Sequence, residues 1–250
     1  MTGQPRSSPP TLIDSGERMI PTEAGEISFT YERHAFAYRY ARQFVEGKTV
    51  LDVGCGTGYG AHILAQRARA VTAVDKSEEA IAYCRAHSAG PCIEFCVQRT
   101  EELSFSAPFD VGVSFQMIEH LQDPLGFLRS LRQAVTPRGV ILISTPNLRA
   151  GHSAGEENPF HLSEMTFGEF SALLDASFQS YRLLGIAPST APVWRRALRR
   201  LPFYRWGRGI RRTNPLKRIA NRAMDLTNFR VIDHAVAAEA IDLLAICDNE

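Results

Sequence analysis

Three glycines, Gly54, Gly56 and Gly58, directly follow a short apolar run that is typical of a buried strand. Glycine is needed where the backbone turns sharply or where a ligand approaches it closely. A second apolar run ends in Asp75, 21 residues beyond Gly54 and close to the ~20 residues expected for an acid that binds ribose. These residues predict a nucleotide-type site at the carboxyl ends of parallel strands. The alternative for Asp75 is a cap on the following helix.

The glycine spacing argues against a dinucleotide cofactor. The dinucleotide fingerprint Gly-x-Gly-x-x-Gly requires a third glycine where this chain has Tyr59. A pyrophosphate also needs a tight cradle at a helix N-terminus. S-adenosylmethionine (SAM) has no phosphate and needs room for its methionine part and an acid for its ribose. The pattern therefore favours SAM.

Two histidines could act as a general base. His120 follows an expected strand at 110–115, and His161 follows another at 139–144. A histidine that titrates near neutral pH suits removal of a proton from a hydroxyl acceptor. The structural alternatives are that His120 packs against the next helix and that His161 anchors its loop.

The elements that must position these residues alternate between strands and helices, which predicts a parallel sheet wrapped by helices. Two helix starts carry capping residues, Ser77 and the pair Asp123-Pro124. The expected strands are 49–53, 71–75, 93–97, 110–115, 139–144 and 181–185, and the expected helices are 28–46, 58–67, 77–87, 123–135 and 166–176.

Composition gives ordinary globular values, with 44% hydrophobic and 22% charged residues in 250. Five cysteines without paired spacing predict reduced thiols and no metal site. Residues 1–10 lack the pattern of a signal peptide, and no apolar run approaches the ~20 residues of a membrane span. A cytoplasmic protein is expected.

The chain resembles the class I SAM-dependent methyltransferases of the bacterial small-molecule, sugar and glycan type. The resemblance rests on the runs 51–58, 74–75, 109–121, 137–139 and 144–147. It implies a Rossmann-like α/β fold, whose seven-stranded, mostly parallel sheet has helices on both faces and an antiparallel last strand. The run 243–247 is the expected last strand, preceded by a helical insertion.

The resemblance also implies roles for individual residues. The three glycines would line the methionine part of SAM, Asp75 would bind the ribose hydroxyls, and Gln116 would lie under the sulfonium. An acid that often contacts the adenine amino group is replaced by Arg99 here, so the amide near Thr100 or the side chain of Glu101 could serve instead. The complete expected cofactor set is Asp52, Gly54, Cys55, Gly56, Gly58, Tyr59, Asp75, Lys76, Thr100, Glu101, Gln116 and Arg39.

Four regions are expected: an N-terminal segment with a lid helix (1–46), a SAM-binding core (47–186), a basic helical insertion (187–238) and the final strand of the core (239–250). His34 and the pair Arg39-Tyr40 are assigned to the lid because they resemble a stretch that lies over the cofactor in related enzymes. The alternative is ordinary packing with solvated basic residues.

The insertion concentrates positive charge. Residues 194–222 contain ten Arg and one Lys, and residues 176–224 contain no Asp or Glu. Three interpretations remain open: a substrate cap with solvated arginines, a patch that binds the inner face of a membrane through arginines and aromatic residues, and a nucleic-acid groove. The last is the least favoured, because no nucleic-acid-binding module accompanies the charge.

The expected function is transfer of a methyl group from SAM, leaving S-adenosylhomocysteine (SAH), to a hydroxyl of a small molecule, sugar or lipid-linked glycan. One alternative is N-methylation of an amino sugar or of RNA. An alternative of another class is a non-catalytic binding or scaffold protein with the same fold. The sequence leaves the acceptor and the oligomeric state open.

Overall fold

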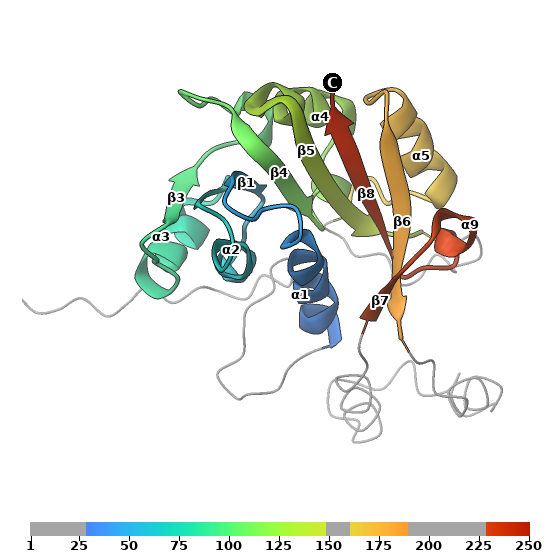
Figure 1. Ribbon diagram of the computed structural model, residues 1–250, viewed down its shortest axis with the longest axis horizontal. Helices are drawn as coiled ribbons and strands as arrows, with labels where there is room; N and C mark the ends of the chain where they lie inside the picture. Colours follow the sequence, from blue (N-terminus) through green and yellow to red (C-terminus); the bar gives the residue numbers. More distant parts are fainter. Residues whose placement is uncertain (1–28, 149–160, 190–228) are drawn as a thin grey trace, which may run out of the picture.

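The computed structural model describes residues 29–148, 161–189 and 229–250 (Figure 1). In the first of these ranges the elements are α1 (Phe29–Ala41), β1 (Thr49–Val53), α2 (Tyr59–Ala65), β2 (Ala70–Asp75), α3 (Glu78–His87), β3 (Ile93–Val97), η1 (Thr100–Glu102), β4 (Phe109–Phe115), η2 (Ile118–His120), α4 (Pro124–Ala134) and β5 (Val135–Pro146). The other two ranges hold α5 (Phe167–Asp175), β6 (Tyr181–Pro188), β7 (Phe229–Ile232), α9 (His234–Ala237) and β8 (Asp242–Asn249). The arginine-rich segment 194–222 lies outside the described residues.

The strands form one mixed sheet in the order β3-β2-β1-β4-β5-β8-β6-β7. Strands β1 to β5 pair in parallel, whereas β8 runs antiparallel to both β5 and β6. The expected α/β fold with an antiparallel last strand is therefore confirmed, and all seven expected strands are present. The short strand β7 adds an eighth, paired with β6, from within the segment assigned to the insertion.

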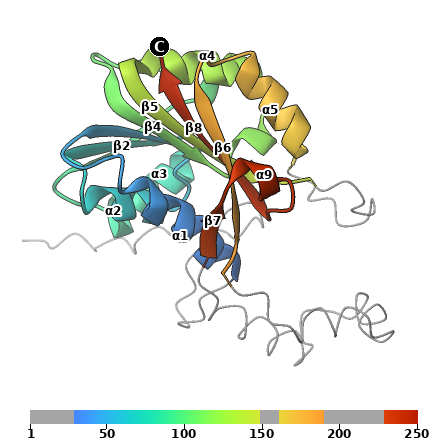
Figure 2. The same cartoon turned by 45° about the vertical axis from the view of Figure 1, so that its right-hand side comes forward.

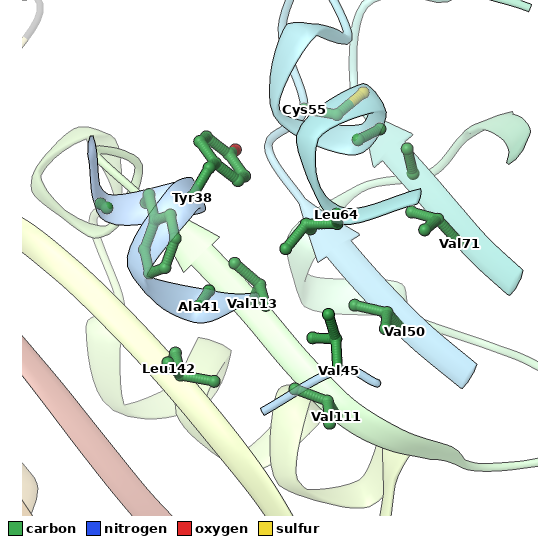
Figure 3. Close-up of a cluster of buried hydrophobic side chains, with 14 of the residues drawn as sticks. Tyr38, Ala41, Val45, Val50, Cys55, Leu64, Val71, Val111, Val113 and Leu142 are labelled. Carbon is green, nitrogen blue, oxygen red and sulfur yellow. The ribbon is translucent and has the colours of Figure 1, made fainter. Parts of the chain in front are cut away.

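Helices cover both faces of the sheet (Figures 1 and 2). Helices α1, α2 and α3 pack on one face around a core that includes Tyr38, Leu64 and Ile81. Figure 3 shows part of this core, in which Val50, Val111 and Val113 of the sheet lie beneath the helices. Helices α4 and α5 pack on the other face, around a core that includes Leu131, Phe170 and Leu174. Because side chains of a strand alternate between faces, each central strand supplies both cores.

Local capping sets the starts of the helices as the sequence predicts. The Ser77 hydroxyl accepts a hydrogen bond from Ala80 N at 3.2 Å, and an Asp123 carboxylate oxygen accepts one from Gly126 N at 2.8 Å. Strand β5 begins at Val135 rather than at the expected residue 139, and Arg138 within it has φ 68°. These caps fix where each loop at the carboxyl ends of the strands begins and ends.

Candidate cofactor and acceptor site

A cavity of about 400 Å³ opens at the carboxyl ends of β1, β2 and β4. The chain runs from β1 to β2 and β3 on one side and continues with β4 and β5 on the other, so the cavity lies where the strand order reverses, the usual ligand position in such sheets. Ten of the residues expected from the sequence line it: Gly54, Cys55, Gly56, Tyr59, Asp75, Lys76, Thr100, Glu101, Gln116 and His120.

The three glycines of the loop have different reasons for being glycine. All three have positive φ, with values of 81°, 54° and 78° for Gly54, Gly56 and Gly58. A Cβ at Gly54 would lie 2.5 Å from Met117 Cγ, and one at Gly58 would lie 3.0 Å from Cys84 Sγ. A Cβ at Gly56 would meet nothing within 4 Å. Gly54 and Gly58 are therefore required by packing, whereas Gly56 leaves open space for a ligand.

Asp75 holds this loop in place from the end of β2. One carboxylate oxygen accepts a hydrogen bond from Gly56 N at 3.0 Å, and the other accepts one from Ser77 N at 2.9 Å. The helix cap itself is the Ser77 side chain, so Asp75 is not the capping residue of α3. An ionised carboxylate accepts about four hydrogen bonds. Asp75 can therefore support the loop and still accept hydrogen bonds from a ligand in the cavity.

Asp52 lies beneath the loop and does not line the cavity. It is fully buried, and the Tyr38 hydroxyl donates a hydrogen bond to one of its oxygens at 3.1 Å. Burial raises the pKa of Asp52 to about 7; the Tyr38 hydrogen bond acts against this shift, and the charge of Asp75 adds to it. Asp52 thus anchors α1 to the end of β1.

The lid helix contributes to the cavity through residues other than Arg39. The Arg39 guanidinium pairs with Glu32 on the same helix at 2.8 Å, and Arg39 is absent from the cavity lining. His34, which is expected in the lid from the sequence, and Tyr38 line the cavity. Burial lowers the pKa of His34 to about 3, with the charges of Arg33 and His161 adding to the shift, so this ring is neutral at neutral pH.

Gly58 lies at the start of α2 and does not line the cavity, whereas the residues expected near adenine do line it. Glu101 and Arg99 form an exposed ion pair at 3.8 Å, and both line the cavity together with Thr100. This arrangement leaves the Glu101 carboxylate and the backbone of Thr100 both available to a ligand.

The two expected histidines come together although 41 residues separate them in the sequence. Their ring centroids lie 4.9 Å apart at an interplanar angle of 80°. His120 lines the cavity, whereas His161 lies beside it and outside the lining. His161 Nδ1 is hydrogen-bonded to the Glu164 carboxylate, which fixes the orientation of its ring. His120 is therefore the imidazole closer to a ligand.

Glu119 completes this group from beneath. Its carboxyl is 1% exposed and accepts a hydrogen bond from the Thr145 hydroxyl at 3.3 Å. Burial raises the pKa of Glu119 to about 8, and the charge of Asp242 acts in the same direction. One ligand-type atom from each of Glu119, His120 and His161 lies within 4.8 Å of the other two.

An ion pair that was not expected from the sequence joins α1 to β8. Arg33 Nε of α1 lies 3.2 Å from a carboxylate oxygen of Asp242, which is 1% exposed at the start of β8. Burial raises the pKa of Asp242 to about 6, while Arg33 and Gln116 oppose the shift. Gln116 has φ 54° and donates its backbone N–H to Ser144 O at 2.9 Å. No local sequence pattern predicts an ion pair whose two residues are 209 positions apart in the chain.

Comparison with known proteins gives this site a family. The family described as "Methyltransferase domain" matches residues 44–184. A probable S-adenosylmethionine-dependent methyltransferase of Mycobacterium tuberculosis (strain H37Rv) is 38% identical over 185 residues, which are 72% of this chain and 66% of that protein. The ubiquinone biosynthesis O-methyltransferase of Pseudomonas paraeruginosa is 36% identical over 110 residues, 42% of this chain and 47% of that protein.

Among solved structures, a methyltransferase in complex with the Haloferax volcanii Trm112 methyltransferase activator has the same fold, with a TM-score of 0.62 at 18% identity over 87% of this chain and 90% of that one. The chain belongs to the methyltransferase domain family, in the class I SAM-dependent group. SAM is the cofactor of this class, and the open space at Gly56 and the Asp75 carboxylate fit it.

Proposed function

We propose that the protein transfers a methyl group from SAM to a hydroxyl of a small molecule, sugar or lipid-linked glycan. The observation that carries this proposal is the convergence on one cavity of the glycine loop, Asp75 and His120, with Glu119 and His161 directly beside it. The residues proposed to bind the adenosyl group (the glycine loop and Asp75) and the residue proposed to accept the proton (His120) therefore line the same cavity.

The cofactor side of the cavity would bind and orient SAM through the chain's own groups. The loop 54–58 provides backbone and open space for the methionine part, and Asp75 accepts hydrogen bonds from the ribose hydroxyls. Lys76 and residues 99–101 surround the adenine. When bound, SAM supplies a methyl group that is already activated by its positive sulfur.

His120 would take the proton of the acceptor hydroxyl on a ring nitrogen, because it is the histidine that lines the cavity. His161, held by Glu164, would position the His120 ring through the edge-to-face contact. His34 and Tyr38 of α1 would close the cavity from above and exclude water, which strengthens the electrostatic interactions inside.

A hydroxyl acceptor is supported by the O-methyltransferase named among the relatives. A lipid-linked or anionic acceptor is supported by the arginine-rich segment 194–222, which would hold the protein at the cytoplasmic face of a membrane. The described helices include none with the length and apolar character needed to span a bilayer. Flotation with anionic liposomes at low salt tests this part: the protein should float with them, and Arg→Gln changes within 194–222 should abolish flotation.

The transfer itself is tested with methyl-labelled SAM and matched acceptors that carry either a hydroxyl or an amine at one position. Label should enter the hydroxyl compound, and His120→Ala should slow turnover at least about 10-fold while SAH affinity is retained. Label in the amine alone would favour N-methylation. SAM binding without transfer to any acceptor in the panel, or no SAM binding at all, would favour the scaffold alternative.

A further inference from the structure

The loop after β4 and the segment after β5 bring a carboxylate and two imidazoles together. Glu119 and His120 lie in η2, and His161 is the first residue of the described range 161–189 that follows β5. Their ligand-type atoms all lie within 4.8 Å of one another. Two imidazoles and one carboxylate form a donor set typical of a divalent transition-metal ion.

The two segments are fixed to each other by backbone hydrogen bonds. The Glu119 carbonyl accepts from Leu162 N at 2.8 Å and from Ser163 N at 2.9 Å. The Ser163 hydroxyl lies within hydrogen-bonding distance of three carbonyls of the other segment, the shortest being Leu121 O at 3.1 Å. The three side chains are therefore held together by the fold and do not depend on a ligand to meet.

The groups behind the three side chains are those that orient metal ligands. The Glu164 carboxylate is hydrogen-bonded to His161 Nδ1, and the Thr145 hydroxyl donates a hydrogen bond to the Glu119 carboxylate. Carboxylate–histidine pairs of this kind fix the tautomer and raise the basicity of a ligating imidazole. A carboxyl that is 1% exposed also gains from a cation, because its ionised form is otherwise poorly solvated.

The ligand geometry is close to what an ion requires. Two ligands at about 2.1 Å from one tetrahedral ion lie about 3.4 Å apart. The present separations lie within 4.8 Å, so each side chain would have to move by up to about 0.7 Å to bind one ion. The two nitrogen ligands favour Zn²⁺ over Mn²⁺, Mg²⁺ and Ca²⁺, which prefer oxygen ligands.

We propose that Glu119, His120 and His161 bind a divalent transition-metal ion such as Zn²⁺ at the acceptor side of the cavity. Its role rests on the proposed function: the open positions of the ion would take the oxygen of the acceptor hydroxyl and lower its pKa. The O–H bond then breaks heterolytically, the proton goes to water, and the oxygen keeps the electron pair. In the metal-bound protein the ion activates the acceptor, because an imidazole nitrogen that ligates the ion cannot accept this proton. The proton-accepting role proposed for His120 then belongs to the metal-free protein.

Titration of metal-stripped protein with Zn²⁺ and with Mn²⁺ in a calorimeter tests the site without reference to methyl transfer. We expect one ion per chain, with Mg²⁺ weaker. Glu164→Gln should weaken binding about 10- to 100-fold, and the double change His120→Ala/His161→Ala should weaken it more than that. His62→Ala, a change at an exposed histidine on α2, is the matched control and should bind as wild type does.

SAH binding and the thermal melt of each variant show whether it is folded. Equal metal affinity in wild type and the folded double variant, or no binding to wild type, would overturn the site. Methyl transfer that survives chelation in a protein without metal binding would leave the proposed function intact and remove this inference. If the protein binds the metal but methylates no hydroxyl, the metal site stands and its proposed role in activating the acceptor is refuted.

Discussion

Replacing Asp75 by Asn removes the charge that we expect to hold the ribose of the cofactor. The two carboxylate oxygens each accept one backbone N–H, from Gly56 and Ser77. About two of the four acceptor positions of the carboxylate therefore remain for ribose hydroxyls. Hydrogen bonds to a charged group contribute about 1.5–3 kcal/mol each. Loss of the charge should weaken SAH binding by about 3 kcal/mol, or roughly 150-fold.

A loss of affinity alone would not separate ribose binding from damage to the loop. Calorimetry with SAH and with its 2′,3′-dideoxy analogue makes that distinction. In wild type the dideoxy compound should bind roughly 100-fold more weakly, and in Asp75→Asn this difference should shrink below about 10-fold, because the partner of the hydroxyls is already changed. Asp123→Asn, at a helix cap outside the cavity, should leave the difference at its wild-type size. An undiminished difference in Asp75→Asn would refute the ribose assignment.

Two further pairs of variants test the loop and its support. Gly58→Ala should lower the free energy of unfolding by roughly 2 kcal/mol in urea titrations, since it combines positive φ with a crowded Cβ. Gly56→Ala should lower the free energy of unfolding by less than Gly58→Ala does, but it should weaken SAH binding. Equal losses of stability in the two variants would contradict the packing explanation. The raised pKa of Asp52 means that the native chain keeps a proton that the unfolded chain loses near pH 3.8. Stability therefore falls as the pH rises from about 4 to about 7, by up to about 4 kcal/mol. The stability of Asp52→Asn relative to wild type should therefore rise by that amount between pH 4 and pH 7. The pKa of Asp110 is lowered, so the stability difference between Asp110→Asn and wild type should stay constant over the same range.

The strand-loop-helix unit around Gly54 to Gly58 could be predicted from the sequence because its signals are local. Apolar runs, glycine spacing and helix caps all act within a few residues, and the structure places them as expected. The antiparallel strand β8 could be expected only through the family resemblance. Four-residue β7 gave no pattern of its own, because its pairing with β6 decides its conformation.

The acceptor side was less predictable because its residues meet through tertiary packing. The cavity-facing side of α1 cannot be chosen from its mixed aromatic and basic pattern. Of the residues expected in the lid, His34 lines the cavity and Arg39 does not, whereas Tyr38 lines it without having been expected. The contact of His120 with His161 depends on Ser163 joining two separate segments. Such contacts require the three-dimensional course of the chain.

The position of β8 between β5 and β6 has a consequence for biosynthesis. This strand joins the two parts of the sheet, yet it is the last of the described strands to leave the ribosome. Until then the facing edges of β5 and β6 expose unpaired backbone groups and apolar side chains, which is the condition under which nascent chains aggregate. Newly made molecules should depend on chaperones during the interval in which residues 189–241 are translated.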